Sequence, residues 1–158
     1  MILNLTYNVN LREGCSGVMH IDIDMFVDLR RIEQLKYDYC WRYDSGDLDG
    51  LMELFTEDAV CELGLFGTWH GQGEIRRGYR ELIESTGIPG SRRHAPANPQ
   101  IEVLGDVARG RWYLVDYRTE RGVTQPVRVV ATYDDEYQRS ETGWLVSRTS
   151  LEIQWIEP

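Results

Sequence analysis

The chain has 158 residues, with 17 Lys and Arg against 26 Asp and Glu, and a formal net charge of −9. A chain of this length suits a single domain that buries a sizeable core. The negative balance argues against a nucleic-acid partner, because basic clusters such as Arg76-Arg77 and Arg92-Arg93 are too short to follow a phosphate backbone.

Membrane and metal partners are also not expected. No apolar stretch approaches the roughly 20 residues that cross a bilayer. The three cysteines, Cys15, Cys40 and Cys61, are odd in number and lack metal-ligand spacing, so we interpret them as reduced thiols of a cytoplasmic protein. Neither a nucleotide-binding glycine loop nor a zinc-binding histidine pair is present.

Residues 1–24 have neither a helical nor a strand period, and we expect an irregular N-terminal extension ahead of one domain at 25–158. From Met25 to Tyr43 the apolar residues recur every three or four positions, which predicts a helix. Asp44 begins a break, and Asp47 can cap a second short helix whose apolar stripe runs to Phe55.

The next segments predict a turn over 56–58, a strand over 59–63 and a bend over 64–67. The segment 69–73 leads into a third helix, whose apolar face holds Ile75, Tyr79, Leu82 and Ile83. Residues 87–90, which include Pro89, close it.

The rest of the chain predicts strands joined by short turns, over 101–104, 108–117, 126–139 and 144–155. Residues 91–99, which contain Pro96 and Pro99, read as a loop. Helices followed by a run of strands indicate an α+β fold. We expect the three helices to pack on one face of a strongly curved antiparallel sheet, making a cone whose mouth holds a ligand.

The strand over 110–117 carries an unusual carboxylate. Alternation places Asp116 in line with Trp112 and Leu114, while Tyr113, Val115 and Tyr117 face the other way. Asp116 can lie in water at the strand end, pair with an Arg, or stay protonated in an apolar site. The open face of the sheet is expected to display Tyr113, Val115, Tyr117, Trp144 and Trp155, and this much apolar surface predicts a homo-oligomer.

Three further residues are candidates for chemistry. His94, stiffened by nearby prolines, is either an exposed loop residue or a base that works near neutral pH. Asp44 is either a turn residue or the carboxylate that orients one nitrogen of His94. Tyr39 fits simple core packing, and its phenol also suits an oxyanion donor.

Several motifs together resemble the SnoaL-like branch of the NTF2-like superfamily, over about residues 27–156. They are Tyr43-Asp44 before a short helix, residues 55–60 (FTEDAV), Trp69-His70-Gly71 opening the third helix, His94 before the sheet, and Thr142-Gly143-Trp144 opening the last strand. The resemblance implies an NTF2-like cone. It does not fix the reaction, because this superfamily hosts dehydratases, isomerases, cyclases, epoxide hydrolases and non-catalytic binders.

Within that branch the pattern is most similar to bile-acid 7α-dehydratase, whose catalytic residues match Tyr39, Asp44, His94 and Asp116. Scytalone dehydratase is a more distant likeness. Hexachlorocyclohexane dehydrochlorinase shares the dyad at Asp44 and His94. It needs a Lys at Tyr39 and an Arg at Thr149, so dehydrochlorination is not expected.

The resemblance implies a mechanism without metal or organic cofactor. His94, oriented by Asp44, removes a proton beside a carbonyl or an aromatic-stabilised carbon. Tyr39 donates a hydrogen bond to the enolate oxygen, and Asp116, kept protonated, gives its proton to the departing hydroxyl. The expected substrate-lining residues are Tyr43, Trp112, Leu114 and Thr149.

The sequence therefore predicts a dehydratase that acts on a hydroxylated, mainly apolar cyclic molecule such as a steroid or polyketide. An isomerase or cyclase, a non-catalytic binding module, and a small subunit that only assembles with a larger oxygenase chain are the alternatives. A trimer is expected before a dimer, on the strength of the dehydratase resemblance.

Overall fold

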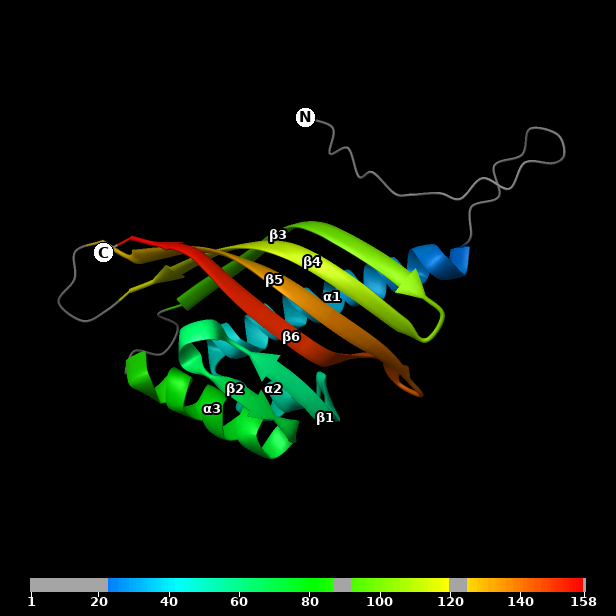
Figure 1. Ribbon diagram of the computed structural model, residues 1–158, viewed down its shortest axis with the longest axis horizontal. Coiled ribbons are helices and arrows are strands. Elements are labelled where there is room, and N and C mark those ends of the chain that lie inside the picture. The colour runs from blue at the N-terminus through cyan, green and yellow to red at the C-terminus, as the bar shows by residue number, and fades with distance from the viewer. Residues whose placement is uncertain (1–22, 87–91, 120–124, 158) are drawn as a thin grey trace, which may run out of the picture.

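The computed structural model describes residues 23–86, 92–119 and 125–157, and shows helices against one curved sheet (Figure 1). The helices are α1 (Ile23–Ser45), α2 (Leu48–Met52) and α3 (Gly71–Thr86), with a 3₁₀ turn η1 (Gly64–Phe66). The strands are β1 (Phe55–Glu62), β2 (Thr68–His70), β3 (Arg92–Leu104), β4 (Val107–Arg118), β5 (Val127–Ser140) and β6 (Gly143–Ile156). This is the predicted α+β fold.

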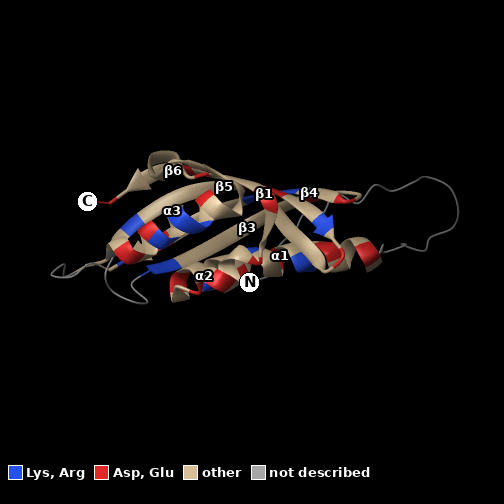
Figure 2. Ribbon diagram, turned by 90° about the horizontal axis from the view of Figure 1, so that it is seen from below, with Lys and Arg blue, Asp and Glu red and all other residues tan. Residues whose placement is uncertain are grey.

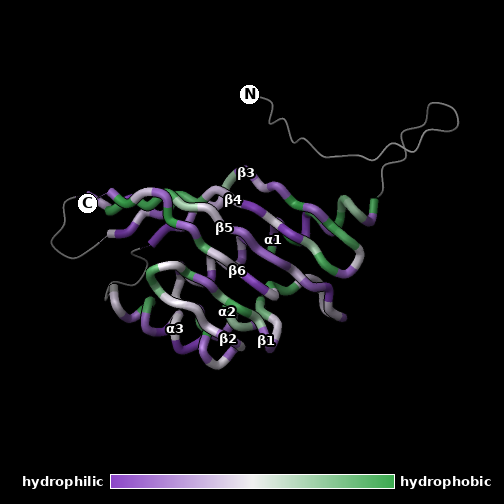
Figure 3. Tube along the Cα trace, in the orientation of Figure 1, coloured by the Kyte–Doolittle hydropathy of each residue, from purple (hydrophilic) through white to green (hydrophobic). Residues whose placement is uncertain are grey.

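The sheet has the order β2-β1-β6-β5-β4-β3. Strands β3 to β6 form the predicted antiparallel meander. The first two strands add a feature that the sequence did not indicate, because β1 pairs in parallel with β6 while β2 pairs with β1 antiparallel. Hydrophobic and hydrophilic positions alternate along the long strands (Figure 3), as expected for a sheet with one buried face.

Helix α1 lies along the concave face of this sheet (Figure 1), with Ile32, Leu35, Tyr39 and Tyr43 buried. It begins at Ile23, two residues before the predicted start; the remainder of the predicted extension lies outside the described residues. The side chain of Asp47 caps α2 by accepting a hydrogen bond from Gly50 N at 3.0 Å. On α3, Arg76, Arg77 and Arg80 lie between Glu74 on one side and Glu81 and Glu84 on the other, so the helix has both basic and acidic positions (Figure 2).

Four local predictions were wrong, and in each case packing or pairing in the sheet determines the observed structure. Helix α2 ends at Met52, because the carbonyl of Leu54 accepts a hydrogen bond from Val146 N at 2.8 Å and Phe55 begins β1. The predicted turn over 56–58 belongs to β1. The predicted loop over 91–99 is β3 from Arg92 onward.

The fourth concerns Trp144, which was expected on the open face of the sheet. It is buried, and its Nε1 donates to Asp28 Oδ1 at 3.0 Å. Tyr113 and Trp155 do lie on the outer face, where they are 56% and 48% exposed.

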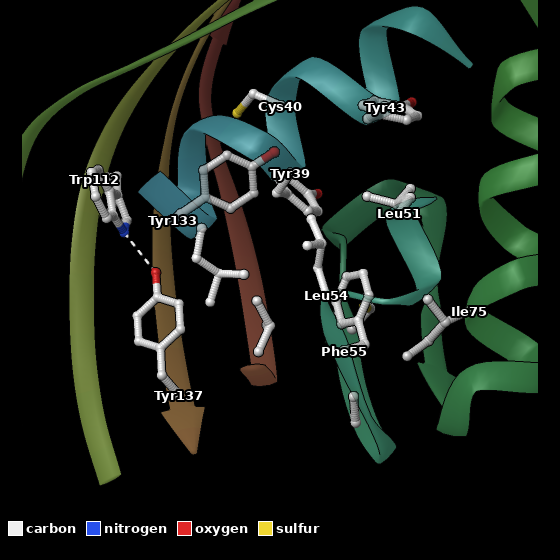
Figure 4. Packing of buried hydrophobic residues seen from close by; sticks show 14 of the residues in the cluster. Tyr39, Cys40, Tyr43, Leu51, Leu54, Phe55, Ile75, Trp112, Tyr133 and Tyr137 are labelled. Carbon is white, nitrogen blue, oxygen red and sulfur yellow. Dashed lines mark hydrogen bonds between the residues drawn. The ribbon is translucent and has the colours of Figure 1, made fainter. Parts of the chain in front are cut away.

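Buried aromatic residues fill much of the space between α1 and the sheet (Figure 4). Cys40 and Cys61 are free and buried within this core, and Cys15 lies outside the described residues. None of the helices in the described part of the chain is long and apolar enough to cross a membrane.

Candidate active site

His94 and Asp44 meet where the end of α1 faces the first residues of β3. His94 Nδ1 lies 2.6 Å from Asp44 Oδ1, and the backbone N–H of His94 donates to Asp44 Oδ2 at 2.8 Å. The sequence predicted this contact. A carboxylate that accepts Nδ1–H fixes the tautomer, and it leaves Nε2 with a free lone pair. The His94 side chain is 7% exposed, so its ring is almost fully desolvated.

Asp116 lies directly across from His94, because the two residues are register partners on β3 and β4. Asp116 Oδ2 is 3.9 Å from His94 Nε2, too far for a direct hydrogen bond but close enough for both atoms to contact one bound group. Burial raises the pKa of Asp116, and the charge of Asp44 adds to this, while His94 and two arginines oppose it. Among the described residues, its buried Oδ1 has no hydrogen-bond partner.

The ring of Tyr43 packs against the ring of His94, with ring centroids 4.9 Å apart. Its hydroxyl oxygen accepts a hydrogen bond from Arg92 Nη1. Burial raises the pKa of Tyr43 to about 12, against the charge of Arg92, which lowers it. The phenol therefore stays protonated at neutral pH and can donate.

Sequence reasoning missed Arg92, which it took for a surface or loop residue. The signal was present in the spacing, because Arg92 and His94 stand two residues apart and share a face once this segment is a strand. In the parts of the chain that the structure describes, no group of three His, Cys, Asp or Glu side chains is placed to hold a metal ion.

The SnoaL-like domain family matches residues 26–150, which is most of the chain. The protein belongs to the SnoaL-like family. No curated protein matches its sequence.

Solved structures share its fold at low identity. A scytalone dehydratase-like protein from Novosphingobium aromaticivorans superposes with a TM-score of 0.78 at 17% identity, covering 87% of this chain and 91% of that one. The hexachlorocyclohexane dehydrochlorinase LinA-type3 from Novosphingobium barchaimii gives 0.76 at 19%, covering 87% and 94%. An NTF2-like protein with a cystatin-like fold from Novosphingobium aromaticivorans gives 0.70 at 25%, covering 84% and 85%.

Tyr39 of this SnoaL-like protein lies in the core one turn before Tyr43 on α1 (Figure 4). Its hydroxyl is 2.7 Å from that of Tyr79, and its ring makes edge contacts with Tyr79 and Tyr133. The phenol that contacts the His94 ring is therefore Tyr43. An active-site role for Tyr39 stays a prediction.

The expected lining residues Trp112, Leu114 and Thr149 are all buried on the inner face of the sheet. Trp112 Nε1 donates to Tyr137 Oη at 3.0 Å, and Thr149 Oγ1 donates to Asp135 Oδ1 at 2.6 Å. The polar groups of Trp112 and Thr149 are thus engaged inside the protein. Contact of any of the three residues with a substrate stays a prediction.

A second charged pair, which sequence reasoning also missed, holds this inner network together. Lys36 Nζ lies 2.9 Å from Asp135 Oδ2, with side-chain exposures of only 2% and 1%. Tyr137 Oη donates to the same Asp135 oxygen at 2.8 Å, and the Lys36 ammonium stands 3.3 Å from the centroid of the Tyr133 ring. A lysine on α1 and a single aspartate on a strand give no local signal that they will pair.

Proposed function

We propose that this SnoaL-like protein is a cofactor-independent dehydratase that acts on a hydroxylated, mainly apolar cyclic small molecule. The observation that carries the proposal is the arrangement around His94. Asp44 engages Nδ1 at 2.6 Å, and Nε2 points to a desolvated Asp116 at 3.9 Å. A base and an acid with opposite tasks side by side are what an elimination of water requires.

In the proposed reaction His94 Nε2 takes a proton from a carbon next to a carbonyl, and the electron pair of that C–H bond forms the enolate. The enolate then collapses to a C=C bond as the C–O bond to the leaving hydroxyl breaks. Asp116 supplies the proton that turns this hydroxyl into water. The imidazolium afterwards returns its proton to Asp116, directly or through one water molecule, and both groups are reset.

We assign the hydrogen-bond donor to the enolate oxygen to Tyr43 in place of Tyr39. The ring of Tyr43 touches the ring of His94, whereas the hydroxyl of Tyr39 is engaged with that of Tyr79. A donor must lie close to the oxygen on which charge develops if it is to lower the barrier. The location of Tyr43 supports this role.

The names of two structural neighbours agree with an elimination, since one is called a scytalone dehydratase and another a dehydrochlorinase. At 17% and 19% identity these neighbours share the fold, and the reaction is argued from the residues of this chain. A pure binding module would be expected to pair Asp116 with an Arg. The unpartnered Oδ1 within the described residues favours the enzyme.

The test is turnover on a panel of cyclic β-hydroxy ketones, bicyclic and steroidal, followed by the ultraviolet absorbance of the conjugated enone. His94→Ala is expected to lower turnover about 10²–10⁴-fold, while ligand affinity is kept, because a general base is lost. His70→Ala, which removes an exposed histidine from β2, is the matched control and should leave turnover unchanged. Equal effects of the two substitutions, or no enone from any member of the panel, would refute the dehydratase.

A further inference from the structure

We propose that Arg92 is a positioning residue that acts through Tyr43, and that the two together form an oxyanion site for an enolate or phenolate oxygen. This inference rests on the proposed function and adds the charge that stabilises the intermediate. The site therefore selects ligands whose oxygen becomes anionic. Neither residue alone would stabilise an anionic oxygen in this way. Arg92 is buried behind the phenol, and Tyr43 carries no charge.

The first observation is a buried cation with neutral partners. Arg92 is 7% exposed, and its guanidinium donates to the hydroxyl of Tyr43, to the carbonyl of Leu82 and, at 3.5 Å, to Ser85 Oγ. Within the described part of the chain, no carboxylate lies in ion-pair distance of it. A buried charge without a counter-charge is costly. That cost falls when negative charge develops next to it, as it does on an enolate oxygen held by Tyr43.

The second observation is the direction of the hydrogen bond. A guanidinium only donates, so Tyr43 must accept from Arg92 with its oxygen. The hydroxyl proton of Tyr43 therefore points elsewhere, and among the described residues it has no acceptor. A phenol that already accepts from a cation is polarised and becomes a better donor in its turn. The ring of Tyr43 packs against the ring of His94, so the phenol and the base belong to one cluster.

The third observation concerns the surrounding charges. Asp44 and Asp116 both raise the pKa of Tyr43, because they oppose negative charge near the phenol, and Arg92 lowers it. Arg92 likewise lowers the pKa of Asp116. Without this guanidinium, only the weaker effect of Arg118 would offset the two carboxyl groups that an anionic oxygen at Tyr43 faces.

The same contacts could serve a purely structural purpose, since Arg92 joins β3 to the last turn of α3 through Leu82 and Ser85. If Arg92 is only a structural tether, its replacement lowers the stability of the fold by the same amount whatever residue stands at position 43. A residue that acts through Tyr43 would lose its influence on an anion once the phenol is gone. A double-mutant cycle therefore separates the two roles.

The probe is 4-nitrophenol, whose phenolate form is read by its visible absorbance, titrated with the full chain at the pH where half of the free probe is ionised. The wild type is expected to bind the phenolate in preference to the phenol. Tyr43→Phe and Arg92→Met are each expected to weaken phenolate binding roughly tenfold or more, as for the loss of a charge-assisted hydrogen bond. In the Tyr43→Phe background, Arg92→Met should cause little further loss.

The controls match each substitution. Tyr133→Phe removes a core phenol, and Arg77→Met removes an exposed charge from α3; both should keep phenolate binding. Arg92→Lys retains the charge and should recover most of the affinity, with thermal melts to confirm that each variant is folded. Equal losses from Arg92→Met in the two backgrounds, or wild-type preference for the neutral phenol, would overturn the inference. Phenolate selection without turnover on hydroxy ketones would retain the oxyanion site and reject the dehydratase.

Discussion

The buried pair of Lys36 and Asp135 provides a stability test that needs no substrate. Asp135 accepts from Lys36, Tyr137 and Thr149, at 2.9, 2.8 and 2.6 Å, and is almost completely buried. Asp135→Asn preserves the volume but removes the counter-charge. It also replaces one carboxylate oxygen with an amide N–H₂ group, which only donates, so a hydrogen bond on that side is lost or, at a hydroxyl such as that of Thr149, must reverse its direction.

The expected cost is large. Removing one partner of a buried ion pair leaves an uncompensated charge and typically destabilises a protein by about 3–5 kcal/mol. For a domain of this size each kcal/mol lowers Tm by about 2–4 °C, so the loss in Tm is roughly 6–20 °C. Lys36→Met with Asp135→Asn should cost less than Asp135→Asn alone, because no charge is then left without a partner.

The assay is urea unfolding followed by far-ultraviolet circular dichroism, with the free energy of unfolding obtained by linear extrapolation. The control is Asp49→Asn, which breaks the exposed pair with Arg76 and should leave the midpoint unchanged. A loss below about 1 kcal/mol for Asp135→Asn, within the range of an exposed pair, would refute the role given to this network.

Three further outcomes are expected. Burial raises the pKa of Asp116, so the stability that its proton provides is complete below the unfolded pKa of about 3.9 and is lost as the pH rises through the folded pKa. Asp116→Asn should therefore stabilise the protein at neutral pH and have no such effect in acid; an equal gain at both pH values, measured by urea unfolding, would contradict this. Burial raises the pKa of Cys40 and of Cys61 to about 12. In a Cys15→Ser variant, a thiol-specific disulfide reagent should therefore react with these thiols only after unfolding, and prompt labelling of the native protein would be the opposing result. We also propose that the protein forms a homo-oligomer through the outer face of the sheet. Sedimentation at micromolar concentration should show the oligomer, and Trp155→Glu should weaken it. A stable wild-type monomer would count against this proposal.

The sequence alone determined the elements whose pattern is local. The helical period placed α1 within two residues of its start and end, and the alternation of β4 put Trp112, Leu114 and Asp116 on the buried face. Both patterns can be recognised from neighbouring residues in the sequence, because a helix or a strand buries one face at a fixed spacing. The contact of Asp44 with His94 came from a resemblance of motifs, since the two residues lie 50 positions apart.

Only the tertiary structure decided whether the segment before the meander is a strand. Pro96 and Pro99 indicate a loop, yet β3 is an edge strand, where a missing backbone N–H is tolerated. A register shift between Ala97 and Gln100, with Asn98 at a positive φ of 52°, accommodates the second proline. Sheet pairing thus overrode the local turn signal, and it also drew Phe55 out of the predicted helix.

The tertiary structure also decided which polar groups meet inside the cone. Tyr39 and Tyr43 are one helical turn apart and equally plausible from spacing, but only the packing of β3 against the end of α1 brings Tyr43 to His94. Arg92 and the pair of Lys36 with Asp135 escaped sequence analysis for the same reason. A buried charge is defined by its partner and by the water it has lost, and neither is encoded in the residues beside it in the chain.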